Sequence, residues 1–114
     1  MPFINVKLTV PVSDEKKEIL QGKIADHVAT ALGKPRQYIM TSIETEKDLW
    51  FAGKKMDNGA FIAVSTFGTP SRSGCEDLTK KFCATLAAEL GTPGSQIYVA
   101  YYPLENWGWN SMNF

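Results

Sequence analysis

Apolar and polar residues alternate in two segments of this 114-residue chain. In residues 2–10 the apolar positions are Pro2, Ile4, Val6, Leu8 and Val10, with mostly polar residues between them. Residues 60–67, Ala-Phe-Ile-Ala-Val-Ser-Thr-Phe, form the second such segment. A period of two is typical of a strand whose two faces meet different surroundings. We therefore predict strands over residues 2–10 and 60–67.

A second pattern, with apolar residues four positions apart, follows each of these segments. It comprises Leu20, Ile24, Val28 and Leu32 in the first half and Leu78, Phe82, Leu86 and Leu90 in the second. This spacing places the apolar side chains on one stripe of a helix. Asp14 and Glu15 precede the first stripe, where negative charge stabilises a helix N-terminus. The pattern predicts two amphipathic helices, the second preceded by a loop at residues 68–71.

The chain contains an internal repeat with an offset of 58 residues. Leu32-Gly33-Lys34-Pro35 recurs as Leu90-Gly91-Thr92-Pro93. Glycine after the last helical residue permits a left-handed cap, and the following proline prevents continuation of the helix. Segments 38–45 and 96–102, which come next, are again strand-like. Each half therefore reads strand, helix, strand.

These elements predict an α/β (α+β) fold of one domain, residues 1–114. A strand–helix–strand unit of this length implies parallel strands and a right-handed crossover. Two pseudo-symmetric units would form a four-stranded sheet with both helices on one face. Two helices cannot cover both faces, and we expect residues such as Ile4 and Phe61 to remain on the open side. Such an apolar face favours oligomerisation.

Composition narrows the function classes. Twelve basic residues balance twelve acidic ones, so no net field attracts nucleic acid or an anionic membrane. No segment has the length of a membrane span, and no basic-then-apolar N-terminal region marks a secretory signal, so we expect synthesis in the cytoplasm. Cys75 and Cys83 lie eight residues apart on the predicted second helix, about 12 Å along its axis, too far to pair. With His27 as the only histidine, no metal site is expected.

Pro2 is the first candidate for chemistry. Methionine is normally removed before a small residue, which would leave the nitrogen of Pro2 as a free secondary amine. An α-amino group, with a pKa of about 7.7–8.0, is one of the few bases available near neutral pH. The alternative is that Pro2 starts an edge strand, where it costs no ladder hydrogen bond.

Several motifs together resemble macrophage migration inhibitory factor and the tautomerase superfamily. They are Pro2 after Met1, Gly33-Lys34-Pro35 followed by Gln37-Tyr38-Ile39, Tyr98 in Ile97-Tyr98-Val99, Gly108-Trp109-Asn110 and the terminal Asn113-Phe114. The resemblance runs from end to end. It implies a homotrimer with three active sites at subunit interfaces, a cofactor-free reaction without metal, and a small keto acid as substrate.

The resemblance also implies roles for individual residues. Pro2 would be the base, and Lys34 would pair with a substrate carboxylate that the Phe67 amide shares. Tyr98 would enter from a neighbouring subunit. Aromatic residues would form an apolar wall that, with the charge of Lys34, keeps the amine neutral. That wall would draw on Phe3, Phe67, Tyr98, Trp107, Trp109 and Phe114. From the residues alone, Lys34 can equally be a solvated charge near a helix C-terminus, and Tyr98 a strand-packing residue.

Some positions depart from the family. Phe67 replaces a common isoleucine, and Trp107 replaces a small aliphatic residue. Ala100 stands where the vertebrate cytokine has an asparagine that could meet a ring hydroxyl. We therefore expect a tighter and more apolar pocket. The Cys-x-x-Cys of the vertebrate protein is replaced by residues 59–62, Gly-Ala-Phe-Ile, so its thiol oxidoreductase activity should be absent.

The function that best fits these features is keto–enol tautomerisation of phenylpyruvate-like and dopachrome-like compounds. One alternative is a signalling protein released by a leaderless route, with a vestigial pocket; no sequence feature specifies a receptor. Another is a hydratase, dehalogenase or decarboxylase reaction in which an arginine beside Pro2 activates the substrate. Arg36 and Arg72 are the only arginines, and both lie in predicted loops.

Overall fold

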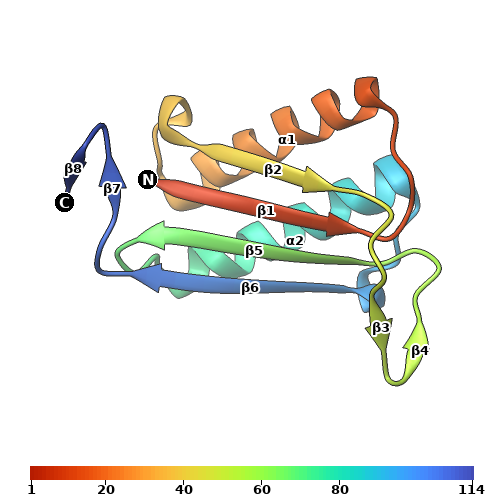
Figure 1. Cartoon of the computed structure of the whole chain (residues 1–114). Coiled ribbons are helices and arrows are strands. Elements are labelled where there is room, and N and C mark those ends of the chain that lie inside the picture. The colour runs from red at the N-terminus through yellow and green to blue at the C-terminus, as the bar shows by residue number, and fades with distance from the viewer.

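A four-stranded sheet forms the centre of the structure, a computed structural model that describes all of residues 1–114. The strand order is β2 (Met40–Glu44), β1 (Pro2–Leu8), β5 (Ala60–Phe67) and β6 (Ile97–Leu104). The pairs β1–β2 and β5–β6 are parallel, whereas the central pair β1–β5 is antiparallel. Helices α1 (Asp14–Leu32) and α2 (Arg72–Leu90) cover the same face of the sheet (Figure 1). The predicted fold of two β-α-β units is confirmed.

The two halves repeat each other closely in their helices. Each helix has 19 residues, and α2 begins 58 residues after α1. Each starts at a serine whose hydroxyl accepts a hydrogen bond from the helix, from the Lys16 amide to Ser13 at 3.2 Å and from the Gly74 amide to Ser71 at 3.1 Å. Each ends at a glycine in the left-handed region, Gly33 at φ 63° and Gly91 at φ 67°. The caps predicted from Leu-Gly-x-Pro are therefore present.

The strands after the helices begin later than predicted. A single 3₁₀ turn precedes each one, at Arg36–Tyr38 before β2 and at Gly94–Gln96 before β6. In the first turn the amides of Tyr38 and Ile39 donate to the carbonyls of Pro35 and Arg36, at 3.1 Å each. These amides are therefore used locally, and residues 38 and 39 do not join the sheet.

The core lies between the helices and the covered face of the sheet. The apolar stripes of both helices and alternate residues of β1 and β5 are buried in it, and Phe82 at its centre has no exposed surface. Ile4 is also fully buried on this face, so our assignment of Ile4 to the open face was wrong. Phe61, one position out of phase with the buried residues of β5, is on the open side as expected.

His27 and Thr85 join the two helices at equivalent positions of the repeat. The His27 Nε2 atom lies 2.7 Å from the Thr85 hydroxyl, and the residues are 58 positions apart. The helices are also linked by Glu89 of α2, whose carboxylate contacts Lys16 and Lys23 of α1 at 3.4 and 3.0 Å. Cys75 and Cys83 both lie on α2 and are free, as the helical spacing predicted.

Two short hairpins, each a separate two-stranded sheet, lie at opposite ends of the central sheet (Figure 1). The first pairs β3 (Trp50–Phe51) with β4 (Lys54–Lys55), and the second pairs β7 (Gly108–Trp109) with β8 (Met112–Asn113). Each has a two-residue turn in which both residues have positive φ, the geometry of tight hairpins. The β7–β8 hairpin places the C-terminus at the end of the sheet where the N-terminus also lies (Figure 1). No helix is long and apolar enough to cross a membrane.

Candidate active site

A cavity of about 620 Å³ opens where β1 begins. Its wall comes from four regions far apart in sequence: the start of β1, the turn before β2 with the first residue of that strand, the end of β5, and the segment from the end of β6 into β7. It is mainly apolar and contains no charged side chain. Its lining includes Pro2, Phe3, Gln37, Tyr38, Met40, Ser65, Asn106, Trp107 and Trp109.

Pro2 is the first residue of β1 and pairs with Thr66 of β5. Because β1 lies between β2 and β5, Pro2 heads a central strand. The alternative interpretation, in which proline begins an edge strand, is therefore wrong for this chain. A proline at the first position of a central strand places its nitrogen at the end of the sheet, beside the cavity, without removing a ladder bond from the strand interior.

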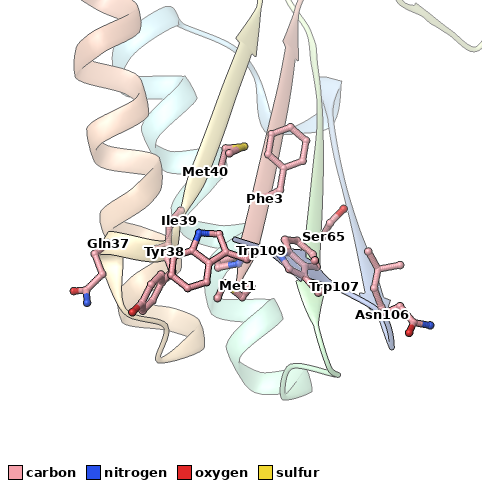
Figure 2. Close-up of a pocket in the computed structure, with 13 residues that line it drawn as sticks. Met1, Phe3, Gln37, Tyr38, Ile39, Met40, Ser65, Asn106, Trp107 and Trp109 are labelled. Atoms are coloured by element: carbon pink, nitrogen blue, oxygen red, sulfur yellow. The ribbon is translucent and has the colours of Figure 1, made fainter. Parts of the chain in front are cut away.

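Aromatic side chains surround the N-terminus. Figure 2 shows the rings of Tyr38, Trp107 and Trp109 around Met1. Tyr38 and Trp109 meet edge to face, with ring centroids 5.7 Å apart and planes at 77°. This contact joins the C-terminal hairpin to the turn before β2, so the hairpin completes one wall of the cavity. Phe67 and Phe114 form a second pair at 5.6 Å, outside the cavity lining.

Met1, next to Pro2, forms a backbone hydrogen bond with β5. Its carbonyl oxygen accepts a hydrogen bond from the Phe67 amide at 3.2 Å. Burial, and next the positive charge of Lys34, hold the pKa of the Met1 amine below its ordinary value. An amine at this end of the chain is therefore biased toward its neutral form, for the two reasons expected of Pro2.

Lys34 is held in place by the end of α1. It follows the left-handed cap at Gly33, and its amide donates to the Ala29 carbonyl at 3.2 Å. Its side chain is half-buried, and no carboxylate lies within 4 Å of its ammonium group. Lys34 does not line the cavity, but its charge reaches the terminal amine. It is thus a cation near the site that has no anionic partner within the chain.

Tyr98 and Ala100 lie far from Pro2 within the chain. Pro2 is aligned with Thr66, and Thr66 with Pro103, whereas Tyr98 is five residues back along β6. That separation corresponds to about 16 Å. Tyr98 instead meets Phe51 edge to face at 5.2 Å and is 63% exposed. A single chain therefore brings Pro2, Trp107 and Trp109 together, but not Tyr98 or Ala100.

Both arginines are paired away from the cavity. The Arg36 Nε atom lies 2.6 Å from the Asp26 carboxylate, and the Arg72 Nε atom 3.0 Å from that of Glu76. Neither arginine lines the cavity. No group of three His, Cys, Asp or Glu side chains is arranged to hold a metal ion.

Several residues of the cavity were not among our candidates, including Tyr38, Met40, Ser65 and Asn106. Tyr38 belongs to the Gln37-Tyr38-Ile39 motif, which we used to recognise the family and did not assign to the site. Ser65 shares the open face with Phe61 in the period-two pattern of β5, which was a usable signal. Met40 and Asn106 had no such signal, because Met40 is placed by the turn that leads into β2 and Asn106 lies in the loop between β6 and β7.

The repeated β-α-β units define an α+β fold of the kind found in tautomerases, with a cavity at Pro2. Residues 1–114 match the macrophage migration inhibitory factor (MIF) family, and the chain belongs to this family. Macrophage migration inhibitory factor of Xenopus laevis is 28% identical over 116 residues, which cover 100% of this chain and 99% of the relative. The D-dopachrome decarboxylase of Gallus gallus is 28% identical over 108 residues, or 94% of this chain and 90% of the relative.

A solved structure agrees with this assignment. Leishmania major MIF2 superposes with a TM-score of 0.92 at 30% sequence identity, covering 100% of this chain and 97% of that protein. The family assignment from the sequence motifs is therefore confirmed, and the fold is that of MIF proteins.

Proposed function

We propose that this chain is a cofactor-free keto–enol tautomerase acting on phenylpyruvate-like keto acids, with the free nitrogen of Pro2 as the base. The observation that carries the proposal is the contact between the Phe67 amide and the Met1 carbonyl at 3.2 Å. Removal of Met1 would release two groups at once, the amine of Pro2 and the amide of Phe67. In the chain that retains Met1, the Met1 carbonyl oxygen occupies the place that one oxygen of a substrate carboxylate would take after Met1 is removed.

The reaction needs a neutral base next to an anion-binding site. The Pro2 nitrogen would remove a proton from the carbon beside the keto group, and the electron pair of that C–H bond would form the C=C bond. The carbonyl oxygen becomes an enolate and then takes up a proton, while Pro2 loses the one it gained. Lys34 and the Phe67 amide would hold the carboxylate. The charge of Lys34 would also oppose protonation of Pro2.

The site would be completed by a second subunit. Tyr98 and Ala100 lie about 16 and 10 Å along the sheet from the level of Pro2, so they would reach a pocket only in a neighbouring chain. Large apolar side chains are exposed on the open face: Met40, Tyr98, Tyr102 and Leu104. A homotrimer would cover this face and place Tyr98 of one subunit near Pro2 of the next.

The D-dopachrome decarboxylase relative makes a dopachrome-type compound a reasonable assay substrate. Reactions that rely on an arginine are less well supported, because the carboxylates of Asp26 and Glu76 engage both arginines outside the cavity. The second candidate function, signalling as a cytokine-like protein, rests on the name of the relatives alone.

The test combines intact mass with tautomerase assays on phenylpyruvate and D-dopachrome methyl ester. We expect a mature protein without Met1 that is active on at least one of them. Pro2→Gly, which keeps an amine but changes its basicity and geometry, should abolish most activity. Full activity in Pro2→Gly, with the fold intact by circular dichroism, would refute the amine-base mechanism.

A further inference from the structure

Ser65 is the one polar side chain of the cavity that is carried by a strand. It is half-buried near the end of β5, on the open face of the sheet. The amides Gln37 and Asn106 also line the cavity, but they are exposed and belong to a turn and a loop. A group on a strand is held more precisely than a group on a loop. Ser65 is therefore the best-positioned hydrogen-bonding side chain of the site.

The Ser65 hydroxyl has no hydrogen-bond partner in the protein. The neighbouring Thr66, by contrast, donates to the Gly68 carbonyl at 2.8 Å. Aromatic residues lie on both sides of Ser65, because it is aligned with Phe3 on β1 and with Tyr102 on β6. Figure 2 shows Ser65 beside Trp107, with its hydroxyl oxygen directed away from Met1 and Trp109.

We infer that Ser65 binds a polar substituent, a hydroxyl group, on the aromatic ring of the ligand. The inference rests on the proposed function, since it takes the ligand to be an aryl keto acid whose carboxylate lies at Lys34 and Phe67. With the carboxylate held there, the ring would lie in the apolar part of the cavity, whose lining includes Phe3, Ser65 and Trp107. A ring hydroxyl placed there needs a partner, because an unpaired polar group in an apolar site is costly.

Ser65 offers the cavity a hydrogen-bonding group that Ala100 lacks. Alanine at this position removes one side chain that could meet a ring hydroxyl, yet the cavity retains a free hydroxyl of its own at Ser65. Ala100 is aligned with Ala63, two residues before Ser65 on β5. The selective contact is thus supplied by β5 of the subunit that carries Pro2, not by β6.

The test compares binding with turnover in wild type, Ser65→Ala, Ser65→Thr and the control Ser42→Ala. Ser42 lies on β2 two residues after Met40, so it shares the open face, but it does not line the cavity. The binding probes are cinnamate and its 3- and 4-hydroxy derivatives, which are planar aryl carboxylates that need no proton transfer. Turnover is measured with phenylpyruvate. Dissociation constants come from calorimetric titration.

For each protein we compare the affinity for a hydroxycinnamate with the affinity for cinnamate. For at least one hydroxycinnamate this affinity ratio should be about tenfold higher in wild type than in Ser65→Ala. Ser65→Thr, which keeps the hydroxyl, should restore most of this preference, and Ser42→Ala should leave it unchanged. Identical relative affinities in wild type and Ser65→Ala would overturn the inference, as would an equal loss in Ser42→Ala. Absence of turnover with the Ser65 effect intact would refute the tautomerase proposal alone. Turnover without the Ser65 effect would refute only the role of Ser65.

Discussion

Replacing Lys34 by alanine tests whether Lys34 acts as a cation of the active site or only as a surface charge. Lys34 is half-buried and has no carboxylate partner within 4 Å. The substitution therefore breaks no ion pair, and the fold loses no stability from such a loss. The end of α1 is fixed by Gly33 and by a backbone bond from Lys34 to Ala29, neither of which needs the lysine side chain. The substitution should therefore act on the site and not on the fold.

The expected magnitude follows from the contact that would be lost. A hydrogen bond to a charged group contributes about 1.5–3 kcal/mol, which corresponds to about one to two orders of magnitude in kcat/KM. A methyl ester lacks the carboxylate charge and should lose far less. The second effect concerns the base. Because the charge of Lys34 lowers the pKa of the terminal amine, its removal should raise that pKa and move the acidic limb of the pH–rate profile to higher pH.

The assay is the pH dependence of kcat/KM for phenylpyruvate and its methyl ester in wild type, Lys34→Ala and Lys80→Ala. Lys80 is exposed on α2 away from the cavity, so it controls for the loss of one positive charge. We expect a large loss on the acid, a small loss on the ester and a shifted limb only in Lys34→Ala. Equal losses on acid and ester, with the acidic limb unmoved, would show that Lys34 is a surface charge.

Three further predictions concern assembly and stability. Light scattering at micromolar concentration should give close to three times the chain mass of 12.6 kDa, and a fully active monomer would contradict the shared site. Phe82→Ala should lower the free energy of unfolding by about 3–5 kcal/mol, because Phe82 is fully buried between the helices and the sheet; a urea midpoint no different from that of Lys80→Ala would contradict this. Burial, and next the charge of Lys81, lower the pKa of His27, with Lys23 adding to the shift and Asp26 and Asp77 opposing it. The unfolded state therefore binds the proton more readily, and stability should fall as pH drops below about 6.5. His27→Gln should flatten that part of the urea-midpoint profile, and an unchanged profile would exclude His27 as its source.

The sequence was sufficient for the fold because its signals were local and repeated. The stripes at Leu20 and Leu78 and the glycines at 33 and 91 each marked one element, and the 58-residue offset tied the two halves together. The short turn before β2 was missed because its three residues form local hydrogen bonds without any proline or glycine inside them. The face of Ile4 was misassigned because periodicity gives two faces without saying which one the helices cover.

The candidate site was predicted only in part. Pro2, Trp107 and Trp109 line one cavity, and the charge of Lys34 lowers the pKa of the terminal amine. Tyr98 lies about 16 Å along the sheet from the level of Pro2, and only the proposed trimer would bring it to a pocket. Met40 and Asn106 depend on how a turn and a loop pass the end of the sheet, which no residue pattern encodes.

The most direct test of the central claim follows the removal of Met1 in one sample. Protein made with methionine aminopeptidase inhibited would keep Met1, whose carbonyl engages the Phe67 amide and whose peptide bond ties up the Pro2 nitrogen. The purified protein is then treated with the aminopeptidase, while intact mass and phenylpyruvate tautomerase activity are measured together. If Pro2 is the base, activity starts near zero and rises in proportion to the trimmed fraction. Full activity before trimming, unchanged as Met1 is lost, would contradict the account.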